Sequence, residues 1–372
     1  MAAISGLPIS AEARNLHQES VVIDLHVDPI IQQALFGYHL SDAHDPNWQP
    51  PKRRWLFNSV QRITKLQKLH CPCFNHIDIP RMLKGGYTFG AFGIHSPPFR
   101  SERCWQTIQK QLAYFHELIT EDERIILAAE PADIRRAFEQ GKLAGFPVVE
   151  GVHCLGKPGK ETCQKRLDRI DELFNKFAVR YFTLTHFTRN DAATSSPWIG
   201  MHKNDGLSEF GNAVIEKMNE VGMIVDLAHA NNQGVLDACK VSKKPVVVTH
   251  TGIKSINNHS RNISDEALKA VAESGGVVGI IFAMHYLSKD KKNPSSKIIL
   301  KHIDTIVQNV GEDHAAIGSD FDGWIPRIPE DMQDAADLPV LTQGMLNMGY
   351  SPERIKKILG ENFLRVWTDI LN

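Results

Sequence analysis

The sequence lacks any long apolar run. Its 372 residues contain no stretch of 18 consecutive apolar residues, so we expect no helix that spans a membrane. The first residues carry no basic segment followed by an apolar core, and the closing "VWTDILN" is not a hydrophobic tail. Neither a secretory signal nor a lipid-anchor signal is therefore predicted. We expect a cytoplasmic protein without a membrane partner.

The chain also lacks an excess of charge of either sign. Lys plus Arg is 42 and Asp plus Glu is 43, which gives a formal net charge of −1. A protein that binds nucleic acid needs a basic surface, so we expect no nucleic-acid partner and a small substrate instead. Six cysteines in a long chain without a secretory signal favour reduced core thiols over a disulfide framework.

Apolar runs alternate with helical patterns along almost the whole chain. Eight runs favour strands, at 21–26, 88–95, 146–151, 179–187, 222–229, 245–250, 275–283 and 314–323. Helical patterns lie between them, for example at 208–222 and 264–275, which begin with the N-cap candidates Ser208 and Ser264. Nearly continuous apolar strands separated by helices indicate a parallel sheet that is covered on both faces.

Eight such units predict an α/β fold, a (β/α)8 TIM-type barrel. A doubly wound open sheet is the alternative, although no Gly-rich phosphate-binding turn follows the first strand. Residues 38–80 interrupt the alternation and predict a loop with a helical piece, inserted after the first strand over the active-site face. Its large rings either wall a substrate pocket or form a surface contact, as in a homodimer. These rings are Tyr38, Trp48, Trp55 and Phe57.

Ionisable side chains end six of the eight predicted strands. They are His26 and Asp28 after the first strand, Glu150 after the third, His186 after the fourth, His229 after the fifth, His250 after the sixth and Asp320 after the eighth. The C-terminal ends of barrel strands meet at one rim, so these imidazoles and carboxylates are expected to converge. Such a cluster is costly to bury without partners, whereas both groups are ligands of zinc and similar ions. The pattern therefore predicts a site for two divalent cations that share a water nucleophile.

Single histidines carry less information than this joint pattern. One His at a strand end is more often a hydrogen-bonded core or rim residue than a ligand, and we assign rim roles to His95 and His153. The segment "HCPCFNH" (70–76) suggests a zinc knuckle, but its C-x-C spacing differs from the usual C-x₂₋₄-C.

Several motifs, in order along the chain, resemble those of one family. They are "IDLHVD", "VVEGVHCL", "YFTLTHFTRNDAA", "GMIVDLAHA", "PVVVTHTGIKSINNHSRNISDEAL" and "AIGSDFDG". They are similar to motifs of the renal or membrane dipeptidases, which are metallopeptidases with an amidohydrolase-like barrel. The motifs cover most of residues 20–365, while 38–80 matches poorly. The resemblance implies that residues 1–372 form a single metal-dependent dipeptidase barrel domain.

The same resemblance implies two zinc ions and their ligands. His26 and Asp28 would hold the first ion, His229 and His250 would hold the second, and Glu150 would bridge both.

Three further residues would act on the substrate. His186 would bind it and steady the tetrahedral intermediate, and Arg261 would grip its terminal carboxylate, for which a bidentate guanidinium is suited. Asp320 would move protons at the nucleophilic water and the leaving amine. The implied activity is hydrolysis of dipeptides with a free C-terminal carboxylate by attack of a metal-bridging hydroxide.

Two other functions stay open. Fold does not fix function, so the same barrel and metals could hydrolyse another amide, a lactam or an ester. A barrel that only binds a partner is the third possibility, and the complete set of candidate ligands argues against it.

Overall fold

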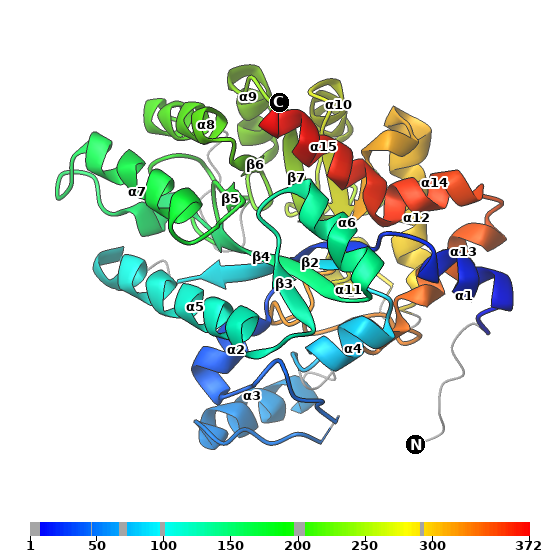
Figure 1. Ribbon diagram of the computed structural model, residues 1–372. Coiled ribbons are helices and arrows are strands. Elements are labelled where there is room, and N and C mark those ends of the chain that lie inside the picture. Colours follow the sequence, from blue (N-terminus) through cyan, green and yellow to red (C-terminus); the bar gives the residue numbers. More distant parts are fainter. Residues whose placement is uncertain (1–7, 46, 67–72, 97–100, 197–204, 291–293) are drawn as a thin grey trace.

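Eight parallel strands form a nearly closed barrel surrounded by helices (Figure 1). The computed structural model describes residues 8–45, 47–66, 73–96, 101–196, 205–290 and 294–372. In order around the barrel, the strands are β1 Ile23–Val27, β2 Phe89–His95, β4 Leu143–Glu150, β5 Tyr181–Thr183, β6 Ile224–Asp226, β7 Val246–Thr251, β8 Val277–Ile280 and β9 Ala315–Ile317.

The last strand returns beside the first. Phe321, just past β9, forms a parallel bridge with Val27, and its carbonyl oxygen accepts a hydrogen bond from the Asp28 amide at 2.8 Å. The predicted barrel is thus confirmed. The doubly wound alternative is wrong, because an open sheet would leave its two edge strands apart.

All eight predicted strands are present, and one more accompanies them. β3 (Ile125–Leu127) pairs with β4 outside the barrel order. Its three residues are too few to give a periodic signal, so the sequence pattern did not reveal it.

Helices cover the barrel and connect its strands. They are α1 Ala11–Gln18, α2 Pro29–Phe36, α3 Arg54–Leu66, α4 Ile79–Lys84, α5 Ser101–Glu121, α6 Pro131–Gln140, α7 Cys163–Asn175, α8 Glu209–Val221, α9 Asn232–Val241, α10 Asp265–Glu273, α11 Met284–Leu287, α12 Ser296–Val310, α13 Pro339–Asn347, α14 Pro352–Lys356 and α15 Asn362–Leu371. Short turns of helix lie at Val152–Leu155, Glu312–His314 and Ala335–Asp337, and a π-helical turn at Lys357–Glu361 joins α14 to α15. The predicted N-caps are confirmed, since Ser208 accepts from the Gly211 amide and Ser264 from the Ala267 amide.

One end of the barrel interior is filled by apolar side chains. A buried cluster draws residues from all eight barrel strands and from α15. Within it, Trp367 of α15 meets Phe146 of β4 edge to face at 5.1 Å, and Phe363 stacks against Phe89 of β2 at 6.1 Å. α15 therefore closes this end, and the strand ends at the other rim are left to carry polar groups.

In its described residues, the segment between β1 and β2 contains the helical piece that the sequence predicts within 38–80. It contains α2, α3 and α4, which lie together at the lower side of the molecule in Figure 1. Phe36, Phe57, Cys73 and Phe74 form a small buried core of their own there, which we call the aromatic cluster.

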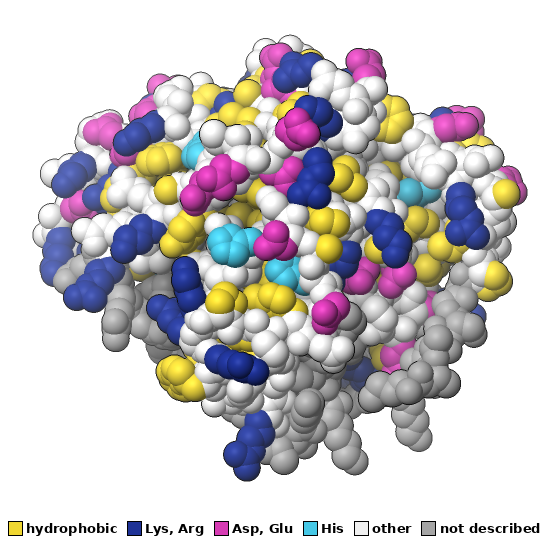
Figure 2. Space-filling model, turned by 60° about the horizontal axis from the view of Figure 1, so that its bottom comes forward, with side chains coloured by type: hydrophobic (Ala, Val, Ile, Leu, Met, Phe, Trp, Pro, Cys, Tyr) yellow, Lys and Arg dark blue, Asp and Glu magenta, His cyan; other side chains and the backbone are white. Residues whose placement is uncertain are grey.

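The distribution of charged side chains on the surface agrees with the nearly equal numbers of basic and acidic residues in the sequence. Over most of the face in Figure 2, Lys and Arg side chains are interspersed with Asp and Glu side chains. In the described part of the chain, no helix combines the length and the apolar character that crossing a bilayer requires.

Candidate active site

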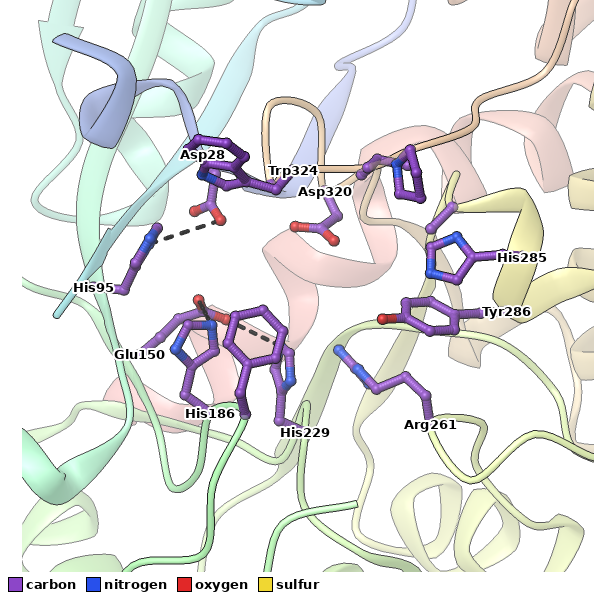
Figure 3. A pocket seen from close by; sticks show the side chains of 15 residues that line it. Asp28, His95, Glu150, His186, His229, Arg261, His285, Tyr286, Asp320 and Trp324 are labelled. Atoms are coloured by element: carbon purple, nitrogen blue, oxygen red, sulfur yellow. Dashed lines mark ion pairs between the residues drawn. The ribbon is translucent and has the colours of Figure 1, made fainter. Parts of the chain in front are cut away.

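The structure brings the predicted strand-end residues together around one carboxylate. Glu150, the last residue of β4, lies 1% exposed at the centre. Its Oε1 is 3.5 Å from His26 Nε2, 3.4 Å from His229 Nε2 and 3.6 Å from His250 Nε2. Its Oε2 is 3.1 Å from His186 Nε2. Four imidazoles from four strands thus aim their Nε2 atoms at one carboxyl group (Figure 3 shows His186 and His229).

The two remaining carboxylates border this centre. Asp28 Oδ1 is 3.2 Å from His26 Nε2, as expected for residues two apart on an extended chain. Asp320 can place a carboxylate oxygen within 4.8 Å of ring nitrogens of both His26 and His250. The predicted convergence of imidazoles and carboxylates is therefore present in the structure.

Hydrogen bonds behind two of the histidines set their tautomers. The Tyr181 hydroxyl donates to the Leu25 carbonyl oxygen at 2.9 Å, so it accepts a hydrogen bond from Nδ1–H of His26. The Thr249 hydroxyl donates to Asp226 and accepts from Nδ1–H of His250. When these rings are neutral, as metal ligands must be, the proton on Nδ1 leaves the Nε2 lone pair facing Glu150.

Gly93 of β2 makes room for Asp28. A Cβ atom at this position would lie 1.7 Å from Asp28 Oδ1 and 3.2 Å from His26 Cε1. Any side chain there would displace the carboxylate. The sequence pattern does not single out Gly93, Tyr181 or Thr249, because none of the three is among the residue types that usually bind metals.

Burial controls the electrostatics of the cluster. Burial raises the pKa of Glu150 to about 8, and burial together with the charge of Asp28 raises the pKa of Asp320 well above its ordinary value. Burial lowers the pKa values of His186, His229 and His250 well below the ordinary value. At His26 burial opposes protonation, but the charges of Glu150 and Asp28 outweigh it and raise the pKa to about 10. The cluster therefore attracts positive charge at its centre.

Backbone strain also marks the rim. His229 has φ +63° and Asp320 has φ +59°, in the left-handed region that non-glycine residues seldom adopt. Such conformations persist where the surrounding structure holds them in place, often at functional sites.

The cluster opens into a pocket of about 460 Å³. Its lining residues are Asp28, His95, Glu150, His186, Phe187, His229, Arg261, Ala283, His285, Tyr286, Asp320, Gly323, Trp324, Ile325 and Pro326. Arg261 is buried, and its Nε and Nη2 atoms have no hydrogen-bond partner among the described residues. Figure 3 shows Arg261, Tyr286 and His285 on one side of the pocket and Asp28, His95 and Trp324 on the other.

Other predicted residues lie outside the centre. His95 lines the pocket, and His153 Nε2 contacts Ser96 instead. Two residues of the zinc-knuckle interpretation of segment 70–76, His70 and Cys71, fall outside the described residues. A third, His76, has its Nδ1 atom 3.1 Å from the carboxylate of Asp322.

The four aromatic rings of the insertion do not line the pocket. Tyr38 and Phe57 are buried, Trp48 packs against the buried core, and Trp55 is 72% exposed. The interpretation of these rings as a direct pocket wall is therefore wrong. Of these rings, Phe57 belongs to the aromatic cluster and Trp48 packs against it. The cluster lies behind the pocket residue Trp324.

Comparison with known proteins agrees with this geometry. The model of the membrane dipeptidases, peptidase family M19, matches residues 10–372. The chain belongs to the membrane dipeptidase family. It is a metallo-dipeptidase, a hydrolase of peptide bonds.

Two similar relatives of this dipeptidase are fungal. Dipeptidase tcpJ of Claviceps purpurea is 30% identical over 310 residues, which are 79% of this chain and 69% of the relative. Dipeptidase ataJ of Aspergillus terreus is 29% identical over 379 residues, which are 93% of this chain and 89% of the relative.

Solved structures share the barrel. An amidohydrolase from Pseudomonas aeruginosa has a TM-score of 0.71 at 23% identity, over 96% of this chain and 98% of that chain. A metallopeptidase from Rhodobacter sphaeroides has a TM-score of 0.75 at 24% identity, over 94% and 99% of the two chains. At this identity the likeness shows the fold.

Proposed function

We propose that this family member is a zinc dipeptidase that hydrolyses dipeptides with a free C-terminal carboxylate. One observation carries the proposal: a single pocket joins the imidazole and carboxylate cluster around Glu150 to the buried guanidinium of Arg261. The cluster suits metal-assisted hydrolysis of an amide, and the guanidinium suits capture of a carboxylate.

The donor set fits a pair of divalent cations. Buried atoms without a hydrogen-bond partner among the described residues include His26 Nε2, Asp28 Oδ1 and Glu150 Oε1, and all three face the centre. In this proposal His26 and Asp28 would hold one zinc ion, His229 and His250 would hold the other, and Glu150 would contribute to both. Zinc bound there would polarise the scissile carbonyl and lower the pKa of water to near neutral.

Asp320 and His186 would handle protons and negative charge. Burial raises the pKa of Asp320, which makes its carboxylate a better proton acceptor. This carboxylate would take a proton from the attacking water and return it to the leaving amine. His186 is neutral near neutral pH because burial lowers its pKa, and its Nδ1 has no partner among the described residues. Its ring would therefore orient the substrate through hydrogen bonds, including one to the oxygen that becomes negative during attack.

Arg261 would fix the substrate by its terminal carboxylate. The charge on this buried side chain is costly without an anionic partner, and a substrate carboxylate supplies one. A metallopeptidase of similar fold, from Rhodobacter sphaeroides, was solved with a phosphinate mimic of the dipeptide L-Ala-D-Ala. We therefore include both stereoisomers at the C-terminal residue of the substrates below.

The decisive experiment compares dipeptides with their amides. Wild-type protein should hydrolyse Ala-Ala, with L- or D-Ala at the C-terminus, and should act poorly on the dipeptide amide. Arg261→Lys keeps the charge but loses the paired hydrogen bonds. Since a charge-assisted bond contributes about 1.5–3 kcal/mol, kcat/KM for the dipeptide should fall roughly tenfold to hundredfold.

The amide should be little affected by Arg261→Lys. The control is Arg189→Lys, whose guanidinium is half exposed and pairs with Asp205 at 3.3 Å outside the pocket lining. Equal wild-type activity on acid and amide would remove the case for carboxylate recognition. Hydrolysis of lactams or esters without any dipeptide would favour the other hydrolase class.

A further inference from the structure

Trp324 stands on the side of the pocket away from Arg261. It belongs to the loop after β9, four residues past Asp320, and it lines the pocket with Ile325 and Pro326. In Figure 3 Trp324 lies beyond Asp320 on the side of Asp28, and Arg261 lies on the opposite side. It gives the pocket a large aromatic surface at the end that the carboxylate-binding group does not occupy.

The loop that carries Trp324 is held in an unusual conformation. Asp320, Asp322 and Trp324 have φ values of +59°, +66° and +59°, which is unfavourable for residues with side chains. Contacts from the segment between β1 and β2 offset this strain. Gln32 donates to the Asp322 carbonyl oxygen at 2.9 Å, and the His76 amide donates to Asp322 Oδ1 at 2.7 Å.

The indole ring is supported from behind by the aromatic cluster. Its centroid lies 5.3 Å from that of Phe74 and 6.2 Å from that of Phe36. Phe57 in turn contacts both of these rings, at 5.3 and 5.7 Å. All three phenylalanines are buried, so the surface that Trp324 presents to the pocket is fixed before a ligand arrives.

We propose that Trp324 is a specificity-determining residue that receives the side chain of the substrate's N-terminal residue, and that large apolar or aromatic side chains are preferred there. The inference rests on the proposed function for the direction of the substrate. With the carboxylate at Arg261 and the scissile carbonyl beside Glu150, the N-terminal residue extends toward Trp324. A flat, preformed ring binds such a side chain with little loss of conformational entropy.

This arrangement also gives the insertion a role. Its phenylalanines do not touch the pocket, but Phe74 supports the ring that does. The segment between β1 and β2 therefore acts on substrate choice through Trp324 as a positioning element.

The test uses three dipeptides and measures kcat and KM separately. Phe-Ala presents the ring at the N-terminus, Ala-Phe presents it at the C-terminus, and Ala-Ala lacks it. Trp324→Ala should raise KM for Phe-Ala about tenfold or more, the scale of losing a large apolar contact, and should leave Ala-Phe and Ala-Ala little changed. Trp324→Phe should show a smaller effect with the same selectivity, and it keeps the test available if the alanine variant does not fold.

Two controls separate a local effect from a general one. Trp55→Ala removes a tryptophan that is 72% exposed on α3 and does not line the pocket, so all three substrates should behave as with wild type. The metal content of every variant should match wild type. An equal loss on all three dipeptides, or a loss confined to Ala-Phe, would overturn the inference and leave the proposed function intact. If wild type cleaves no dipeptide, the proposed function fails and the inference falls with it.

Discussion

Gly93 has no side chain, yet it determines where a candidate ligand lies. It sits on β2 at the point where the Asp28 carboxylate crosses over the strand, and a Cβ would meet Asp28 Oδ1 at 1.7 Å. Tyr181 and Thr249 act in a comparable way by fixing the rings of His26 and His250 through their Nδ1 atoms. The ionisable residues provide the chemistry, and these neighbours provide the geometry.

The variant Gly93→Ala tests whether this neighbour positions the Asp28 carboxylate. It should displace Asp28, reduce the metal bound per chain, and lower kcat/KM by about tenfold to hundredfold, the usual effect of disturbing a ligand's support. Gly90→Ala is the matched control on the same strand, because its Cβ would crowd the flexible end of Met82, at 2.7 Å, and would meet the Phe92 ring at an ordinary contact distance of 3.5 Å. Wild-type metal content and turnover in Gly93→Ala would contradict the role we assign to this position.

At the scale of elements, the loop after β7 depends on α12. His302 of α12 is fully buried, and its Nδ1 accepts a hydrogen bond from the Ile253 amide at 2.9 Å. Its Nε2–H donates to the Leu287 carbonyl oxygen at 3.0 Å. One neutral ring therefore joins the loop that carries Arg261 to α11, which carries Tyr286.

Because the His302 ring is buried, we expect the free energy of unfolding to depend on pH in a specific way. Burial lowers the pKa of His302 to about 4, below the value of 6.5 in the unfolded chain, so protons favour the unfolded state. The stabilisation is present above pH 6.5 and is lost as the pH falls toward 4. About 2 kcal/mol should be lost at pH 5 from this group alone.

Unfolding free energies from urea titrations between pH 7.5 and pH 4.5 would measure this effect. His302→Gln should be less stable than wild type at pH 7.5 and should decline less steeply as the pH falls. The exposed His39 serves as a control, since His39→Gln should keep the wild-type slope. Identical slopes in wild type and His302→Gln would refute the assignment.

At the scale of the whole molecule, the barrel brings carboxylates from distant parts of the chain together at one rim. Asp28, Glu150 and Asp320 are far apart in the chain and meet at one rim, where their mutual repulsion raises the pKa values of Glu150 and Asp320 further after burial has raised them. Cations that bind this rim would relieve the repulsion in the folded state alone. Binding and folding stability should therefore be linked.

Metal removal tests this linkage. Purified protein should contain about two divalent ions per chain, with zinc the main element by mass spectrometry. A strong chelator should abolish dipeptide hydrolysis and lower the thermal midpoint, and added zinc should restore both. Full activity in metal-free protein would contradict the proposed function.

Local sequence patterns predict most of the barrel and the chemical groups at its rim. Each strand is a short apolar run between helix signals, and this pattern depends on near neighbours in the chain. The spacing of His26 and Asp28 placed both on one side of an extended segment. The rule that parallel strand ends share a rim then brought Glu150, His229 and His250 to the same place.

Contacts between residues that are far apart in the chain depend on how the elements pack together. Glu150 became the centre of the cluster because β4 ends beside the other strand ends at one depth, which no local pattern encodes. The loop that carries Trp324 is held by the contact of His76 with Asp322, 246 residues apart in sequence. Such contacts arise from packing between distant elements, so the position of Trp324 and the cluster behind it could not be predicted from periodicity or spacing.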